Sequence, residues 1–290
     1  MLDKRTLKLT THDGCTLVGD IAGLRTGPGV VLLHGGGQTR HSWATAMLKL
    51  VNRGYLVANF DARGHGDSDW SPNGDYTTEV LASDLDLILS VVPRPTALVG
   101  ASMGGLTAFH LVASSAGTIV DALVLVDIVL HPSAAGAEKI HAFMRANQDG
   151  FRCLAEAVAA VTAYNPHRSR PKNASGLMRN LRRRENGRLY WHWDPRMLNA
   201  RPSAEPPYAS EKLLELCGRV TLPTMVIRGG DSDVVDEAGI AEMRKCLPQT
   251  EVFEVPGAGH MVAGDKNDAF TAGMIQFLDR HMPPNIPWDR

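Results

Sequence analysis

Three groups of residues in this 290-residue chain have the types and spacing that nucleophilic catalysis requires. The first is segment 100–105, where Ser102 stands between glycines in the pattern G-x-S-x-G. The apolar run 96–99 predicts a strand, and 103–115 predicts a helix directly behind it. Glycines allow a tight turn that holds the serine hydroxyl at the positive end of the helix. The segment predicts a serine nucleophile, with a packing turn or a phosphate loop as the alternatives.

The second group would activate that serine. A serine hydroxyl needs a base to accept its proton, and the base needs an acid to orient it. His260 stands in a glycine-containing loop after the last predicted strand, and we expect it to be the base. We expect Asp233 to be the acid because the usual turn has the form G-x-x-D. Asp231 is the local alternative. Asp127, which ends the run 122–127, is a third option that we expect to accept structural hydrogen bonds instead.

The third group would bind the oxyanion that forms when a serine attacks a carbonyl. Such a site needs two N–H donors, and one is expected from Met103, the residue after the nucleophile. The other is expected from His34-Gly35-Gly36-Gly37, which follows the predicted strand 29–33. Its glycines leave the backbone free to aim an amide. We choose Gly36, with Gly37 as the alternative.

Length and composition set the class of protein. With 44% hydrophobic residues and a net charge of −1, the chain is typical of a globular protein and has no basic excess for nucleic acid. No run has the length of a signal peptide's apolar core or a membrane span, so we expect no membrane association. The four cysteines show no metal-ligand spacing, which favours a reducing, cytoplasmic setting and no metal site.

The elements that must position these residues alternate along the chain. A hairpin is predicted around Asp13-Gly14, followed by apolar strands separated by helices. This alternation predicts a doubly wound, mostly parallel sheet. From residue 131 to 210 the strand pattern disappears, and Ala, Arg, Met and Pro become frequent. We therefore expect a core domain of residues 1–130 and 211–290, with 131–210 as a helical lid over the carboxyl ends of the strands.

The predicted lid suggests what could surround a substrate. Trp191 and Trp193 could form an apolar wall for a substrate, with Trp43 and Trp70 lining the mouth of the pocket. The alternative for the lid aromatics is a small core of the lid itself. The lid is also basic. Its basic residues could select a carboxylate-bearing substrate, or they could form a solvated face or a subunit contact: Arg168, Arg170, Lys172, Arg179, Arg182, Arg183, Arg184 and Arg188.

Taken together, these motifs resemble those of the α/β-hydrolase superfamily over essentially the full length of the chain. The segments that carry the resemblance are Leu33-His34-Gly35 with Trp43 downstream, 61–68 (DARGHGDS), 100–105, 230–233 and 257–260. The set is similar to the capped branch that contains esterases, haloperoxidases without cofactors, epoxide hydrolases, haloalkane dehalogenases and carbon–carbon bond hydrolases. The resemblance implies an eight-stranded sheet with the lid inserted after strand 6. In this superfamily the strand–turn–helix segment that carries the nucleophile is called the nucleophile elbow, and here it is 100–105. Epoxide hydrolases and dehalogenases carry aspartate at the nucleophile position of the elbow, so Ser102 argues against both activities.

We therefore expect a serine hydrolase that cleaves a small-molecule carboxylic ester through an acyl-enzyme, without metal or organic cofactor. A carbon–carbon bond hydrolase or lactonase acting on an acidic intermediate is the alternative within the same class. A non-catalytic small-molecule receptor on the same fold is the alternative from another class. A homodimer is left open.

Overall fold

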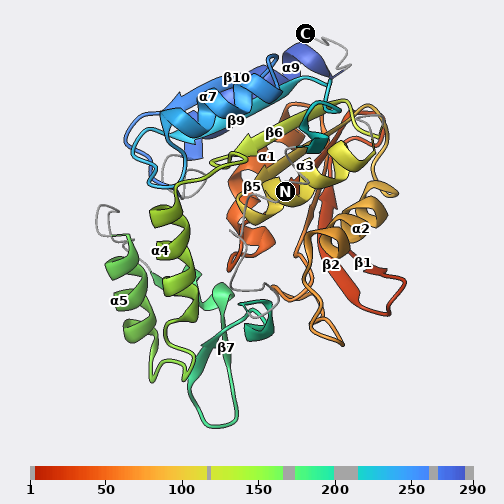
Figure 1. Ribbon diagram of the computed structural model, residues 1–290. Helices are drawn as coiled ribbons and strands as arrows, with labels where there is room; N and C mark the ends of the chain where they lie inside the picture. Colours follow the sequence, from red (N-terminus) through yellow and green to blue (C-terminus); the bar gives the residue numbers. More distant parts are fainter. Residues whose placement is uncertain (1–3, 116–118, 166–173, 199–214, 261–266, 285–290) are drawn as a thin grey trace.

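The computed structural model describes residues 4–115, 119–165, 174–198, 215–260 and 267–284. Its centre is an eight-stranded sheet in the order β1-β2-β4-β3-β5-β6-β9-β10 (Figure 1). The strands are β1 (Arg5–Thr10), β2 (Thr16–Ala22), β3 (Gly29–Leu33), β4 (Leu56–Phe60), β5 (Thr96–Ala101), β6 (Ala122–Val126), β9 (Thr224–Gly229) and β10 (Glu251–Val255). Only β1 with β2 and β2 with β4 pair antiparallel in this sheet, and the other neighbours are parallel. The predicted fold class is confirmed.

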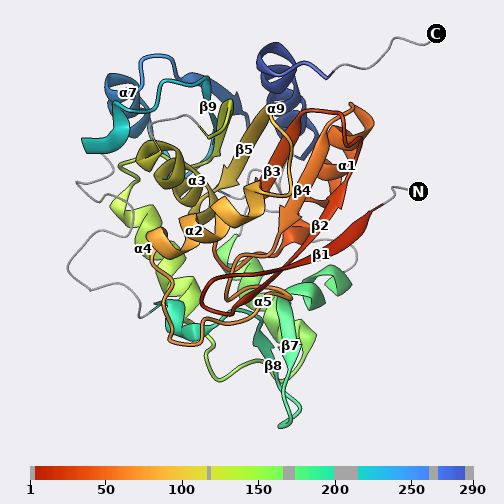
Figure 2. The same ribbon diagram turned by 90° about the vertical axis from the view of Figure 1, so that its right-hand side faces the viewer.

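Helices cover both faces of the sheet, as Figure 2 shows. Alternate strand residues point to opposite faces, so β3 contributes Val30 and Leu32 to one buried cluster and Val31 and Leu33 to the other. The first cluster is covered by α1 (Ala44–Asn52) and α9 (Asn267–His281). The second is covered by α2 (Thr78–Leu89), α3 (Met103–Ser114) and α7 (Glu237–Cys246). Burial on both faces explains why these strands are apolar at nearly every position.

An insertion separates β6 from β9, and we call its described part, 131–165 and 174–198, the cap. It contains α4 (Ala134–Arg145), α5 (Leu154–Tyr164), the short helices η2 (Ala174–Asn180) and η3 (Pro195–Leu198), and the hairpin of β7 (Leu181–Arg183) with β8 (Leu189–Trp191). The cap is mostly helical, as expected, and it also contains a short hairpin that the strand-free pattern of this segment did not predict. Five residues, 184–188, close this hairpin. Its apolar ends, Leu181, Leu189 and Trp191, are buried in the cap's own cluster.

Candidate active site

The turn after β5 has the strained geometry that the glycine pattern predicts. Ser102 has φ +46° and ψ −116°, a conformation that costs energy for a residue with a side chain. A Cβ on Gly100 would lie 2.5 Å from the Gly104 carbonyl oxygen, and one on Gly104 would lie 2.6 Å from the Leu33 carbonyl oxygen. Only glycine fits at either position. The close packing of β5, β3 and α3 therefore holds Ser102 at the sheet's carboxyl edge and at the N-terminus of α3.

The loop after β3 forms a turn over residues 35–38 beside this serine. The Gln38 amide donates to the Gly35 carbonyl at 3.1 Å, and Gly37 has φ +74°, which favours glycine. A Cβ on Gly35 would lie 3.4 Å from Cβ of Ser102, so the turn lies against Ser102. The Gly35 carbonyl also lies 2.9 Å from Nδ1 of His34. Because a trans peptide points its C=O and N–H in opposite directions, the Gly36 amide points away from these partners.

The Gly36 and Met103 amides are the candidates for the oxyanion site. Within the described ranges, neither amide has a hydrogen-bond acceptor. The neighbouring Gly35 amide donates to Oε1 of Gln38 at 3.3 Å, and the Gly37 amide donates to Nε2 of His65 at 3.1 Å. The network thus leaves the Gly36 amide available and uses the Gly37 amide elsewhere, which favours Gly36 over its alternative.

The carboxylate that contacts His260 is Asp127. Its Oδ2 lies 2.7 Å from Nδ1 of His260 and accepts a hydrogen bond from the Ser232 hydroxyl at 2.6 Å. Its Oδ1 accepts from the Gly229 amide at 2.8 Å, and the residue is fully buried. The Ser102 amide donates to the carbonyl of Val126, the residue before Asp127. These bonds hold Asp127 against His260 and place Ser102 beside the same end of β6.

The structure does not place Asp233 beside His260, so that prediction is corrected. The Asp233 carboxylate lies 2.5 Å from Nζ of Lys139 on α4, and its side chain is 43% exposed. Asp231 is also exposed. Asp127, predicted to be a structural acceptor, faces the histidine because its φ of +49° turns the side chain at the end of β6. A lone carboxylate directly after an apolar strand, next to the nucleophile's strand, is the sequence signal that we ranked too low.

Three of the predicted pocket tryptophans have different surroundings. Trp43 is 1% exposed and packs on Phe270 of α9, with ring centroids 5.6 Å apart, so its predicted place at the mouth of the pocket is wrong. Trp191 and Trp193 stack at 4.9 Å in the cap's buried cluster. Trp193 also reaches the core, because a Cβ on Gly37 would lie 3.1 Å from its ring. Met144 of α4 is similarly close to Gly36, so apolar cap residues cover the outer side of turn 35–38.

Four of the predicted basic residues of the cap, Arg182, Arg183, Arg184 and Arg188, have partners outside the site, and Arg179 is exposed. Arg182 donates to the Gly66 carbonyl at 2.8 Å and pairs with Asp67, which fastens the cap to the core. Arg183 and Arg188 bond backbone carbonyls of the cap itself, at Gly187 and at Asp149 and Gly150. The guanidinium of Arg184 lies 4.0 Å from the ring centre of Tyr190. Arg168, Arg170 and Lys172 lie outside the described residues.

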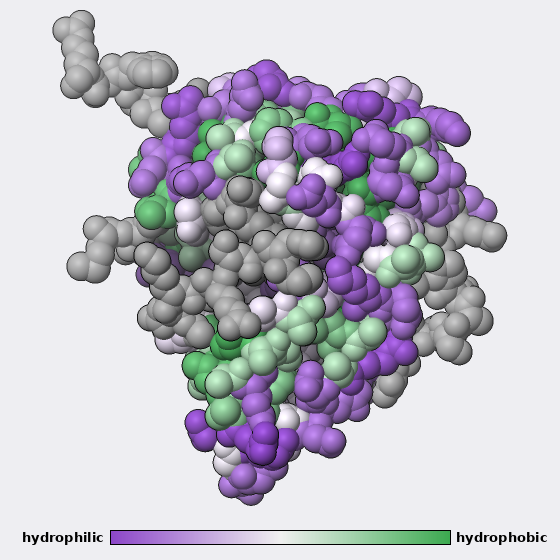
Figure 3. All heavy atoms as spheres, turned by 90° about the vertical axis from the view of Figure 1, so that its left-hand side faces the viewer, coloured by the Kyte–Doolittle hydropathy of each residue, from purple (hydrophilic) through white to green (hydrophobic). Residues whose placement is uncertain are grey.

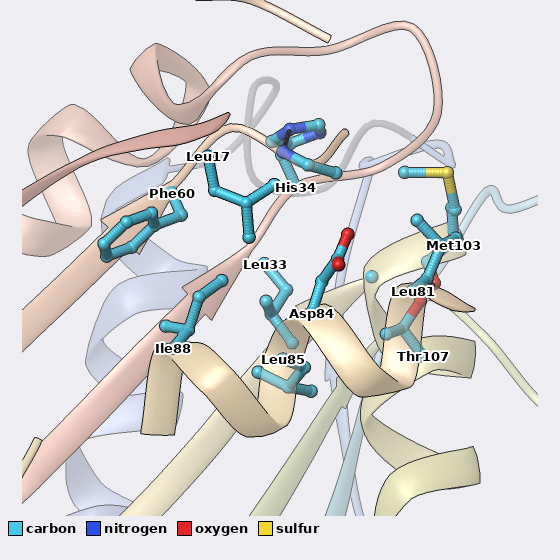
Figure 4. Close-up of a pocket in the computed structure, with 12 residues that line it drawn as sticks. Leu17, Leu33, His34, Phe60, Leu81, Asp84, Leu85, Ile88, Met103 and Thr107 are labelled. Atoms are coloured by element: carbon cyan, nitrogen blue, oxygen red, sulfur yellow. Dashed lines mark hydrogen bonds between the residues drawn. The ribbon is translucent and has the colours of Figure 1, made fainter. Parts of the chain in front are cut away.

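A small cavity lies behind the nucleophile, on the α2 side of the sheet (Figure 4). Its volume of about 30 Å³ suits a water molecule or two and not a substrate. Met103, His34 and Thr107 line it together with apolar residues of α2 such as Leu81 and Leu85. Figure 3 shows the face that bears α4 and α5, with hydrophobic side chains gathered on its lower half.

Fold and site together define the class of this protein: the chain belongs to the alpha/beta hydrolase fold family, whose sequence profile matches residues 28–266. Esterase Rv0045c of Mycobacterium tuberculosis is 33% identical over 276 residues, which cover 90% of this chain and 87% of that protein. The mouse sn-1-specific diacylglycerol lipase ABHD11 is 31% identical over 273 residues, covering 87% of this chain and 81% of that one. These relatives identify the chain as a hydrolase of the α/β-hydrolase type.

Solved structures agree on the fold. An α/β hydrolase from Novosphingobium aromaticivorans superposes with a TM-score of 0.79 at 23% identity, covering 97% of this chain and 99% of that chain. The Mycobacterium tuberculosis esterase Rv0045c superposes with a TM-score of 0.75 at 26% identity, covering 95% and 92%. In the described part of the chain, no three His, Cys, Asp or Glu residues are grouped so that they could hold a metal ion, and no helix is long and apolar enough to cross a membrane.

Proposed function

We propose that this protein is a serine carboxylester hydrolase in which Ser102 is the nucleophile, His260 the base and Asp127 the orienting acid. The observation that carries the proposal is the 2.7 Å contact between Nδ1 of His260 and the buried Asp127 carboxylate, at the strand end next to the elbow. A carboxylate on Nδ1 keeps the proton on that nitrogen. Nε2 is then the nitrogen that can accept a proton from a serine hydroxyl.

The reaction follows from these roles. His260 takes the Ser102 proton as the hydroxyl attacks the ester carbonyl, and the Gly36 and Met103 amides stabilise the tetrahedral oxyanion. The positive end of α3 adds to that stabilisation. The imidazolium, held by Asp127, gives its proton to the leaving alcohol. A water molecule deprotonated by His260 then attacks the acyl-enzyme, and Ser102 is regenerated as the acid product leaves.

The surroundings favour an ester with an uncharged acyl part. Met144 and Trp193 cover turn 35–38, and Arg182, Arg183 and Arg188 of the cap are bonded elsewhere. No contact among the described residues supports a dedicated carboxylate-binding arginine, so the carbon–carbon hydrolase or lactonase alternative gains no support. The names of the relatives, an esterase and a diacylglycerol lipase, are consistent with ester chemistry.

Turnover of p-nitrophenyl esters from C2 to C8 by wild type, Ser102→Ala and Ser90→Ala tests the proposal. Ser90 lies at the exposed end of α2, so its variant controls for the loss of a serine hydroxyl as such. We expect a fluorophosphonate probe to label Ser102, and we expect Ser102→Ala to lose labelling and turnover while Ser90→Ala keeps both. Turnover that survives in Ser102→Ala, or a probe that labels another residue, would refute the assignment.

A further inference from the structure

Three buried histidines line up beside the turn that carries the Gly36 amide. His34 directly follows β3, His65 belongs to loop 61–69 after β4, and His192 follows β8 in the cap. Each is at most 2% exposed. The ring centres of His34 and His65 are 5.0 Å apart, and those of His65 and His192 are 5.7 Å apart. The rings thus form a continuous row from the sheet to the cap.

Each ring contacts a different backbone group of turn 35–38. His34 lies against the Gly35 carbonyl, and Nε2 of His65 accepts from the Gly37 amide. Nε2 of His192 lies 3.0 Å from the Gln38 carbonyl. Glycines at three consecutive positions leave this turn with unusual conformational freedom, and fixed partners are needed to hold one conformation. The histidines supply those partners on both sides of the Gly36 amide.

The positions of the ring protons follow from the partners. His65 accepts at Nε2, so its proton is on Nδ1, which lies 3.1 Å from the Arg63 carbonyl. His192 faces two carbonyls, that of Gln38 at Nε2 and that of Asn180 at Nδ1. Burial lowers the pKa of His192 to about 4, so at neutral pH it has a single ring proton. The backbone amide of His192 already donates to the Asn180 carbonyl, so a ring proton on Nε2 gives each of the two carbonyls one N–H donor, and we assign the proton there.

Loop 61–69 and the cap are fastened to each other at the same place. The Asp194 amide donates to the Gly64 carbonyl at 3.0 Å, and the Tyr76 hydroxyl donates to the Asp194 carboxylate at 2.5 Å. Arg182 reaches the Gly66 carbonyl from β7. The ring of Trp193, which packs on Gly37, lies edge-on to His192. Cap, loop and turn therefore meet at His65 and His192.

We propose that His65 and His192 are positioning residues for the oxyanion hole, and that His192 makes the aim of the Gly36 amide depend on the docking of the cap. The inference rests on the proposed function, because it concerns the same oxyanion site. It goes beyond that function by assigning a role in the core's chemistry to a cap residue. Neither histidine touches the reacting atoms in this scheme, and both act through turn 35–38.

Kinetics of paired variants test this role. His192→Phe keeps a ring against Trp193 but removes the donor, whereas His192→Gln places an amide N–H near the position of Nε2. We expect kcat on a p-nitrophenyl ester to fall about 10- to 100-fold in His192→Phe with KM changed less than about threefold, because oxyanion stabilisation acts on the transition state. His192→Gln should recover most of that loss. For His65, the phenylalanine variant should likewise lose kcat. The glutamine variant should recover most of the loss, because the glutamine oxygen can accept a hydrogen bond from the Gly37 amide.

Two further measurements separate positioning from loss of stability and from failure of the proposed function. Met274→Ala, at a buried site in α9, controls for destabilisation and should keep kcat. Selective ¹⁵N-histidine NMR of the wild type at pH 7.5 should place the proton on Nε2 of His192 and on Nδ1 of His65. Wild-type kcat in His192→Phe, an equal kcat loss in Met274→Ala, or a proton on Nδ1 of His192 would overturn the inference. Absence of ester turnover in the wild type would refute the proposed function. The proton positions would then still show whether His65 and His192 hold turn 35–38 as inferred.

Discussion

Replacing each of the two candidate acids, Asp127 and Asp233, by asparagine is the sharpest test of the site. Asp127→Asn preserves the size of a fully buried side chain, and asparagine tolerates the φ of +49° at this position better than alanine does. The asparagine amide is uncharged and cannot stabilise the His260 imidazolium as the carboxylate does. If its NH2 group faces Nδ1, the ring proton moves to Nε2, and Nε2 can then no longer accept the serine proton. By analogy with the same change in a serine-protease triad, we expect kcat to fall about 10⁴-fold.

Asp233→Asn is the matched control, because it makes the same chemical change in the loop after β9, four residues beyond the strand's last residue. Asp233 is 43% exposed and pairs with Lys139, which is 49% exposed, so the pair contributes at most about 1 kcal/mol to stability. We expect its kcat to stay within about twofold of wild type.

Steady-state turnover of p-nitrophenyl butyrate and the rate of fluorophosphonate labelling would measure both variants, with thermal unfolding to confirm that each is folded. The free energy of unfolding of Asp127→Asn should fall by about 1–3 kcal/mol, because the Gly229 amide and the Ser232 hydroxyl lose a charged acceptor. A folded Asp127→Asn protein that retains activity, or an Asp233→Asn protein that loses it, would show that the acid is assigned to the wrong carboxylate.

Three further predictions concern the packing around the site. Gly104→Ala would put a Cβ 2.6 Å from the Leu33 carbonyl oxygen, and we expect at least about 1–3 kcal/mol of destabilisation and a large loss of kcat, whereas Gly176→Ala, with open space around it, should lose neither in the same melting and turnover assays. Burial lowers the pKa of His192 from 6.5 to about 4, so as the pH falls the unfolded chain binds this proton before the folded chain does. About 3 kcal/mol of the free energy of unfolding is therefore present above pH 6.5 and is lost as the pH falls to 4. The urea midpoint of His192→Gln should depend less on pH over this range than that of the wild type. Asp84→Asn should cost about 3–5 kcal/mol in urea unfolding because the buried Arg63 loses a bidentate partner, and an equally stable variant would contradict this account.

The sequence by itself determined the sheet and the turn that carries Ser102. Apolar runs buried on both faces alternate with amphipathic helices, so strand order along the chain and the parallel fold class follow from local patterns. The elbow around Ser102 is local in the same sense, because its glycines are required by contacts within a few residues and with the adjacent strand β3. The loop position of His260 was predicted on similar grounds, from its place directly after the last strand.

Only the tertiary structure decided which carboxylate faces that histidine. Asp127 and His260 are 133 residues apart, and both Asp127 and Asp233 follow strands that end at the same edge of the sheet. Their difference comes from the left-handed turn at Asp127 and from the Gly229 and Ser232 donors that fix its carboxylate, while Lys139 of the cap draws Asp233 outward. Trp43 illustrates the same limit, since its burial depends on α9, which lies more than 200 residues further along the chain. Local sequence patterns specify the helices, strands and turns. Contacts between segments that are distant in the sequence determine which side chains touch in the site.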